Sequence, residues 1–319
     1  MTPSDWLLYF LPDALWQPFL LLLIGLLALA YGGQQIVPAC IGLANRTGIS
    51  PGVVAVIVIA GGTSAPELIV SIQAALQNSP DIALGNVIGS NLANTLLVLG
   101  LGALFVPIPL HGKHLKRDSL IMIGLTAFTY FCLIAFGGIT ILSALLLLAV
   151  MMVFIHHIIK TGAADDLEDP TDISLSTALF LTVSSVMALL IGADLIVAGG
   201  VDLAERAGFS EAAIGLSIIA IGTSLPEIVA VMASLSGRRF DIALGNIIGS
   251  NIFNLGIVLG ITGLIAPLPL GTDISMATLI LLALSSLALT GLILIGRSLN
   301  RAIAFVFVGF YFLFLNQQL

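Results

Sequence analysis

The sequence predicts an all-α polytopic membrane protein with ten transmembrane helices in two five-helix repeats of inverted topology. Three observations predict this fold: the composition, the spacing of the apolar runs, and a motif pair that recurs at one constant offset. Of the 319 residues, 59% are hydrophobic and 8% are charged, whereas about 25% of the residues in soluble domains are charged. The mean hydropathy is +1.17. A soluble core cannot bury this much apolar surface, so we expect the chain to lie in a membrane.

Ten apolar runs are long enough to cross a bilayer. About 20 helical residues span the ~30 Å hydrocarbon core, and longer helices must tilt. Polar residues, Gly and Pro separate the runs, which lie near residues 15–44, 53–77, 81–105, 118–135, 138–160, 174–205, 212–236, 241–265, 274–295 and 300–316. The longest break, residues 161–173, is acidic. We expect it to be a short solvated linker between an N-terminal repeat, 1–160, and a C-terminal repeat, 174–319.

The positive charges test this count, because Lys and Arg gather in the cytoplasmic loops of membrane proteins. With ten spans, nine of the ten Lys and Arg residues fall in one set of alternate loops: Arg46, Lys113, Lys116, Arg117, Lys160, Arg238, Arg239, Arg297 and Arg301. The opposite set contains Arg206 alone. The distribution predicts that both termini lie outside the cytoplasm and that the 161–173 linker lies inside it.

The two halves carry the same motifs 160 residues apart. Residues 62–67, Gly-Thr-Ser-Ala-Pro-Glu, recur at 222–227 as Gly-Thr-Ser-Leu-Pro-Glu. Two further stretches recur unchanged, 81–86 and 89–91 at 241–246 and 249–251. Five spans separate equivalent points, and because five is odd, the two copies must enter the membrane from opposite sides. Inverted repeats of this kind are typical of secondary transporters, whose substrate site lies near the bilayer midplane.

Each repeat places a glutamate, Glu67 or Glu227, well inside an apolar span. An ionised side chain at the bilayer centre costs about 2.5–3.5 kcal/mol on insertion scales, so such acids are usually functional. A protonated carboxyl in a packed core is the alternative. The equivalent placement of the two acids favours a shared functional role.

A proline precedes each glutamate. Pro66 and Pro226 have no N–H for the carbonyl four residues earlier, so we expect the first copy to break around Gly62, Thr63 and Ser64, and the second likewise. Broken backbone is tolerated in hydrocarbon where protein or a wet cavity satisfies it, and freed carbonyls can bind cations. An ordinary proline kink is the alternative.

The next span of each repeat offers neutral oxygens on one helix face, from Ser90 and Asn94 and from Ser250 and Asn254. For the two serines, interhelical hydrogen bonding is an equal alternative. An oxygen set without His or Cys suits a hard cation such as Ca²⁺ better than zinc or copper. Two glutamates balance one Ca²⁺, two Na⁺ or two protons, so different ions can compete for one site.

At these residues the sequence resembles the sodium/calcium exchanger family of the cation/calcium exchangers, in a bacterial-type short form without a large regulatory loop. The family carries Gly-Thr-Ser-x-Pro-Glu and Gly-Asn-x-x-Gly-Ser-Asn in two alpha-repeats, which here lie at about 53–105 and 212–265. The resemblance implies that Ca²⁺ binds Glu67, Glu227 and the carbonyls of Thr63 and Thr223. It also implies flanking Na⁺ sites that share the glutamates and use Ala60, Ser64, Ser90, Ala220, Ser224 and Ser250. Asn254 departs from the best-described pattern, which has aspartate there, so the central site loses a possible carboxylate.

The predicted function is therefore secondary antiport of Ca²⁺ against Na⁺ by alternating access, without enzymatic activity. A Ca²⁺/H⁺ antiporter on the same fold is the nearest alternative. A cation channel is a second, and an intramembrane hydrolase is a third for which we find no nucleophile with a base. The expected partners are inorganic cations and the lipid bilayer, without nucleic acid or a predictable protein partner. The transported ions are Ca²⁺ and Na⁺, no cofactor is expected, and the expected location is a bacterial or archaeal cell membrane.

Overall fold

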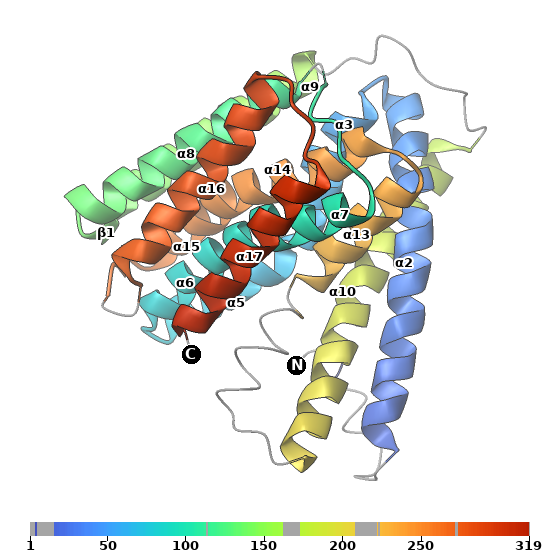
Figure 1. The fold of residues 1–319 in the computed structure, drawn as a ribbon, viewed down its shortest axis with the longest axis horizontal. Coiled ribbons are helices and arrows are strands. Elements are labelled where there is room, and N and C mark those ends of the chain that lie inside the picture. Colours follow the sequence, from blue (N-terminus) through green and yellow to red (C-terminus); the bar gives the residue numbers. More distant parts are fainter. Residues whose placement is uncertain are drawn as a thin grey trace.

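The computed structural model describes residues 4, 16–112, 114–161, 173–207, 222, 224–271 and 274–318, and nearly all of its elements are helices (Figure 1). The first half contains α2 (Gln17–Thr47), α3 (Pro51–Val54), the π-helix η1 (Ala55–Ile59), α4 (Ala60–Thr63), α5 (Ala65–Leu76), α6 (Pro80–Leu92), the π-helix η2 (Ala93–Val98), α7 (Leu99–Phe105), α8 (Leu115–Ala135), strand β1 (Gly138–Ile139) and α9 (Ile141–Thr161). The second half contains α10 (Leu175–Arg206), α13 (Leu225–Ser236), α14 (Phe240–Phe253), the π-helix η4 (Asn254–Val258), α15 (Leu259–Ile265), strand β2 (Leu268–Pro269), α16 (Met276–Leu294) and α17 (Arg301–Gln318).

Each of the ten predicted spans overlaps at least one of these helices. Within the described residues, seven helical stretches are long and apolar enough to cross a membrane, or eight if the bent pair Pro51–Thr63 and Ala65–Leu76 forms one span. Leu225–Ser236 and Arg301–Asn316 are shorter apolar helices. The all-helical polytopic membrane fold is therefore confirmed, and the count of ten stays a prediction.

Two stretches lie at the centre of the bundle. The most apolar windows of Pro80–Phe105 and Phe240–Ile265 are 83% and 78% buried, whereas those of the other five long stretches are 33–44% buried. The outer helices expose large apolar side chains, such as Val153 on α9 and Phe305 on α17, at 69% and 73%. Exposed apolar surface on this scale fits a lipid environment. The motif residues on these two stretches therefore lie inside, shielded from lipid.

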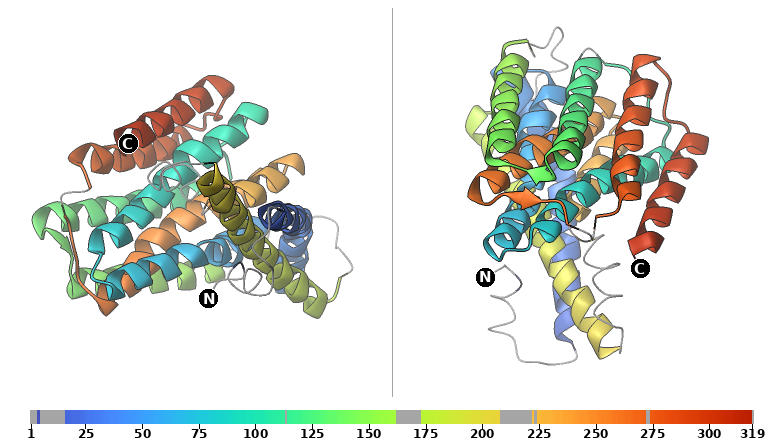
Figure 2. Two further views of the ribbon diagram at one scale, coloured as in Figure 1. Left: turned by 90° about the horizontal axis from the view of Figure 1, so that it is seen from below. Right: turned by 90° about the vertical axis from the view of Figure 1, so that its left-hand side faces the viewer.

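The long helices α2 and α10 lie side by side and project beyond the rest of the bundle (Figures 1 and 2). Their contact is close at glycines: a Cβ added at Gly32 would lie 2.9 Å from the Ser185 carbonyl, and one at Gly192 would lie 2.9 Å from the Gly25 carbonyl. Glycine at these positions lets the two backbones approach. The pair also contacts α13 and α4, which flank the candidate site.

The contacts between the halves repeat at the same offset of 160 as the sequence motifs. Ile139 pairs with Leu268 in the small antiparallel sheet of β1 and β2, and the bridge Ile108–Leu299 joins the equivalent positions with the halves exchanged. The hydroxyl of Thr126 donates to that of its own equivalent, Ser286, at 3.3 Å. A residue that contacts its own equivalent lies near a pseudo-twofold axis. The duplication in the sequence is therefore matched by a duplicated set of contacts.

The helix breaks just before Pro66, at the position predicted from the proline. Helix α4 ends at Thr63, α5 begins at Ala65, and Ser64 between them has φ −82° and ψ 5°. The stretches on the two sides of the break differ in direction by 43°. In the second copy Ser224 has nearly the same conformation, φ −92° and ψ 3°, and α13 begins at Leu225. Pro66 and Pro226 are second in their helices, where the missing N–H costs no helical hydrogen bond.

Candidate cation site

Glu67 lies in the first turn of α5, and its side chain is buried, with a residue exposure of 2%. Ser90 on α6 donates to its Oε1 at 3.4 Å. Its Oε2 has no hydrogen-bond partner among the described residues. One carboxylate oxygen is thus held by the neighbouring span, and the other has unused acceptor capacity.

Asn86 fixes α5 against α6 at the same point. Its side-chain amide donates to the backbone carbonyl of Glu67 at 3.0 Å and to the Ser71 hydroxyl at 2.9 Å. The equivalent residue Asn246 is buried, but neither its amide nitrogen nor its oxygen has a partner in the described part of the chain. One reason is in the sequence, because the equivalent of Ser71 is Val231, which has no hydroxyl.

Glu227 is the matching acid in the first turn of α13 and is 1% exposed. Neither carboxylate oxygen has a hydrogen-bond partner among the described residues. Glu67 is close enough to interact with it electrostatically, and the Thr63 side chain lies beside it. Two carboxylates within range of one another in a poorly solvated interior repel strongly unless a cation or a proton lies between them.

Further polar oxygens around these acids are also buried without a partner. Six buried oxygens without a partner in the described part of the chain lie on predicted site residues: Glu67 Oε2, both carboxylate oxygens of Glu227, Ser64 Oγ, Ser250 Oγ and Asn254 Oδ1. Asn246 Oδ1, Asn251 Oδ1 and Thr262 Oγ1, on the span after Glu227, are unpaired as well. Folded proteins leave few buried polar atoms unpaired, and each costs about 1–3 kcal/mol. All six are oxygens, the ligand type that a hard cation such as Ca²⁺ takes.

The orientation of Asn254 follows from its neighbour. Its Nδ2 donates to Asn91 Oδ1 at 3.3 Å, so the atom left unpaired is the oxygen. Asn251, one turn earlier, donates from Nδ2 to Thr95 Oγ1 at 2.8 Å. Both bonds join the second half to the first. Asn254 opens η4, and its equivalent Asn94 lies in η2, and π-helical turns of this kind often occur at functional sites.

Close packing of α14 against η1 and α4 positions the first copy of the motif. A Cβ at Gly249 would lie 2.8 Å from both Ala60 Cβ and Val56 Cα, and one at Gly245 would lie 2.5 Å from the Gly52 carbonyl. The Ala60 carbonyl accepts from Ser64 N at 3.0 Å and from Thr63 Oγ1 at 3.4 Å. The Ala60 carbonyl therefore already accepts two hydrogen bonds from the residues at the helix break.

The predicted site residues divide into three groups. Direct proximity to a glutamate is found for Thr63 and Ser90. Six more are buried on the same packed segments but make no hydrogen bond to a glutamate carboxylate among the described residues: Ala60, Ser64, Asn94, Ser224, Ser250 and Asn254. Ala220 and Thr223 lie outside the described residues.

Sequence reasoning missed three asparagines and one acid. Asn86, Asn91 and Asn251 belong to the repeated motif, and their recurrence was a signal, but their roles depend on partners in other helices. Asp194 lies inside the candidate span Leu175–Ala204 and accepts from the Ser4 N–H at 2.7 Å. The sequence gives it no motif, and its equivalent Gln34 is not an acid.

Comparison with known proteins identifies the family. The model of the family described as sodium/calcium exchanger protein matches residues 17–160 and 177–319. The inner membrane protein YrbG of Escherichia coli is 35% identical over 259 residues, covering 77% of this chain and 79% of the relative. The sodium/calcium exchanger MaX1 of Methanosarcina acetivorans is 30% identical over 340 residues, covering 93% and 97%.

A solved structure shows the same fold. The sodium-calcium exchanger NCX_Mj, in a structure soaked without Na⁺ and Ca²⁺, superposes with a TM-score of 0.84 and 29% sequence identity, covering 94% of this chain and 98% of that one. The expected bacterial-type short exchanger is confirmed by these similarities. The chain is an integral membrane protein that belongs to the sodium/calcium exchanger family of transporters.

Proposed function

We propose that this chain is a secondary antiporter that exchanges Ca²⁺ for Na⁺ by alternating access at a site between Glu67 and Glu227. The observation that carries the proposal is the group of six buried acceptor oxygens without partners in the described residues, two of them on Glu227 and one on Glu67. The names of MaX1 and NCX_Mj as sodium/calcium exchangers support the choice of ions.

The charges of the site suit this exchange. Two carboxylates carry −2, which one Ca²⁺ or two Na⁺ neutralise, so binding of one ion excludes the other electrostatically. Ca²⁺ takes 6–8 oxygen ligands, and the carboxylates supply the strongest. In the proposed assignment the carbonyls of Thr63 and Thr223 complete the Ca²⁺ site. Ser64, Ser90, Ser224, Ser250, Asn94, Asn254 and the carbonyls of Ala60 and Ala220 serve the flanking Na⁺ positions and the centre.

The proposed architecture has ten spans in two inverted repeats, 1–160 and 174–319, with the 161–173 linker in the cytoplasm and both termini outside. The contacts that recur at an offset of 160 support the repeat. The long α2 and α10 pair would move against the motif-bearing core, so that the site opens to one side at a time. Binding at a midplane site between repeats is the general plan of such transporters.

The test is ⁴⁵Ca²⁺ uptake into proteoliposomes loaded with Na⁺ and diluted into Na⁺-free medium, with K⁺-loaded vesicles as the control. We expect uptake in the Na⁺-loaded vesicles alone. Uptake that needs an imposed pH gradient and no Na⁺ would show a Ca²⁺/H⁺ antiporter instead. Uptake that follows the Ca²⁺ gradient without any counter-ion would show a channel.

Glu67→Gln and Glu227→Gln test the site itself. Each removes one of the two charges that balance Ca²⁺ while keeping the volume of the side chain, and breaking a buried charge pair costs about 3–5 kcal/mol. We expect Na⁺-dependent ⁴⁵Ca²⁺ uptake to fall at least 100-fold in both variants. The matched control is Gln73→Glu, on α5 but two turns beyond the break. Normal uptake by either Gln variant would exclude that glutamate from the site.

A further inference from the structure

A groove opens between α8 and α9, and no residue of its lining belongs to the candidate cation site. Its volume is about 430 Å³, and its lining includes Arg117 and Ile121 from α8 and Val150, Val153 and His157 from α9. Val150 and Val153 are 43% and 69% exposed, and both lie in the candidate span Ile141–Thr161. The apolar part of the groove therefore faces the hydrocarbon of the bilayer.

The groove has a polar end and an apolar end. Val150 and His157 are seven positions apart, which corresponds to about 10 Å along a helix. Arg117 and His157 lie at the polar end, where Lys116 and Lys160 are exposed nearby in the sequence. The two ends of the groove match the two parts of an amphiphile, a charged head group and an apolar chain.

The guanidinium of Arg117 is held in place with part of its donor capacity unused. Its Nε donates to Asp118 Oδ1 at 2.7 Å and its Nη1 to Thr161 Oγ1 at 2.9 Å. Its Nη2 is buried and has no hydrogen-bond partner among the described residues. Thr161 itself donates to the His157 carbonyl at 2.8 Å, which ties the network to α9. Two nitrogens fix the arginine, and the donor capacity that remains is on Nη2 of a residue that lines the groove.

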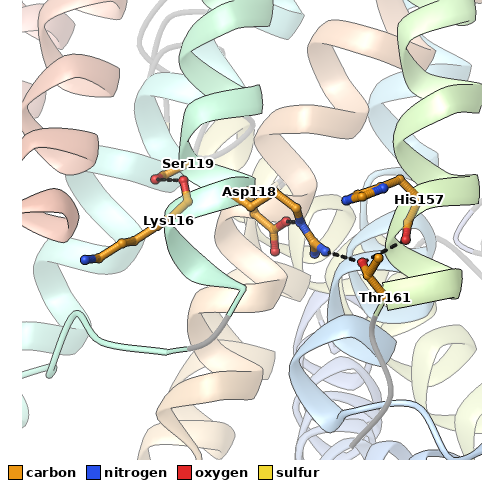
Figure 3. A network of polar contacts seen from close by, with 6 residues as sticks. Lys116, Asp118, Ser119, His157 and Thr161 are labelled. Atoms are coloured by element: carbon orange, nitrogen blue, oxygen red, sulfur yellow. Dashed lines mark hydrogen bonds and ion pairs between the residues drawn. The ribbon is translucent and has the colours of Figure 1, made fainter.

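The charges around this arginine favour an anion. Asp118 is the acid of the network, but it is 4% exposed and its Oδ1 is bonded to Arg117. His114 and His157 also lie close enough to Asp118 to interact with it electrostatically. Figure 3 shows the His157 side chain reaching from α9 toward the α8 residues, with Lys116 on the far side of Asp118. Among the described residues here, two lysines and one arginine stand against one buried aspartate, which leaves the described part of the site positive.

We propose that this groove binds an anionic phospholipid, with the phosphate on Arg117 and an acyl chain along Ile121, Val150 and Val153. Arginine is the preferred partner of phosphate groups because its planar nitrogens match the phosphate oxygens. Basic pockets between transmembrane helices bind anionic lipid headgroups in other membrane proteins. A soluble phosphate would satisfy Arg117 but would leave the lipid-facing apolar wall unused, so the lipid fits the whole groove.

The test is lipid binding by the full-length purified chain in an uncharged detergent, measured by native mass spectrometry and by the thermal unfolding midpoint. We expect phosphatidylglycerol to remain bound and to raise the unfolding midpoint, because a ligand that binds the folded state stabilises it. We expect phosphatidylcholine with the same acyl chains, and inorganic phosphate, to do neither. A shift of the same size with phosphatidylcholine or with inorganic phosphate would overturn the proposal.

Two pairs of variants locate the binding. Arg117→Gln removes the phosphate contact, and its matched control Arg297→Gln removes an exposed cation from the loop between α16 and α17. We expect phosphatidylglycerol affinity to fall about ten-fold in the first and to stay unchanged in the second. Because Arg117→Gln also deprives the buried Asp118 of its partner, Val153→Trp is the second test, since it fills the groove and keeps every charge. Its control is Val306→Trp on α17, where the side chain is 51% exposed. Unchanged affinity in Val153→Trp, or equal losses in a variant and its control, would show that the lipid binds elsewhere.

Discussion

At the scale of single residues, the two repeats are alike in sequence but not in hydrogen bonding. Asn86 and Asn246 are equivalent, yet Asn86 makes two bonds to α5, and Asn246 has none among the described residues. The carbonyl of Glu67 is therefore tied to α6 by a side chain, and the corresponding tie at Glu227 is missing from the described contacts. The two glutamates should differ in how firmly they are positioned.

Substitution of the two asparagines tests this asymmetry. Asn86→Ala removes two hydrogen bonds that position Glu67, and we expect the Ca²⁺ concentration for half-maximal uptake to rise roughly ten-fold. Asn246→Ala is the matched variant, and we expect a smaller change because the described structure gives it no bond to lose. Na⁺-dependent ⁴⁵Ca²⁺ uptake over a range of Ca²⁺ concentrations measures both. Equal shifts in the two variants would contradict the asymmetry.

The sequence alone identifies those site residues whose presence in a transmembrane helix is energetically unfavourable. Glu67 and Glu227 are conspicuous because an acid in an apolar span is expensive, and Pro66 and Pro226 because they lack an N–H. The role of Asn254 could not be derived in the same way. Which of its two amide atoms is left unpaired depends on Asn91, which belongs to the other half and is 163 residues away in sequence.

At the scale of elements, the breaks were predictable and the π-helices were not. Proline fixes the break between α4 and α5 locally, so the sequence places it within a residue. The turns η2 and η4 end at equivalent residues, Val98 and Val258, and begin one position apart, but no residue type in the sequence predicts them. Nearly all residues of both turns are buried, so their surroundings belong to other helices and are not visible in the local sequence. The 43° bend likewise depends on what the two parts of the span pack against.

Packing of α14 on α4 gives a prediction at this scale. In Gly249→Ala the added methyl would lie 2.8 Å from Ala60 Cβ and Val56 Cα, so α14 must move away from the segment that leads into the break. Overpacking of this kind costs about 1–3 kcal/mol. We expect a lower unfolding midpoint in detergent and a loss of Na⁺-dependent uptake.

The control for this substitution is Gly124→Ala on α8. Apart from the neighbouring backbone of α8 itself, no described atom lies within 4 Å of the Cβ position at Gly124, and alanine favours helix over glycine by up to about 1 kcal/mol. We expect an unchanged or slightly higher unfolding midpoint and normal uptake. A Gly249→Ala protein as stable and active as this control would show that the close contact with α4 is dispensable.

At the scale of the whole molecule, the sequence motifs and the contacts between the halves recur at the same offset of 160 residues. The pairs Ile139–Leu268 and Ile108–Leu299, and the self-equivalent pair Thr126–Ser286, place equivalent residues across one axis. These contacts between the two halves could not be predicted from the sequence. The sequence establishes that the halves are duplicated, but it does not show which residues of one half contact which residues of the other. Whether the axis lies in the membrane plane depends on the number of spans in each half. An odd number makes the repeats inverted, and an even number makes them parallel.

Single cysteines at the linker and at the carboxyl end decide between these arrangements. Cys40 and Cys132 are buried, so the unmodified chain is the control for background labelling by a membrane-impermeant maleimide. We expect Asp166→Cys to react in inside-out vesicles but not in intact cells, and Gln318→Cys to react in intact cells. Labelling of both from the same side would mean that an even number of spans follows the linker, which excludes the inverted repeat. Labelling of each from the opposite side to the one expected would keep the inverted repeat and reverse the orientation, against the distribution of nine of the ten Lys and Arg residues.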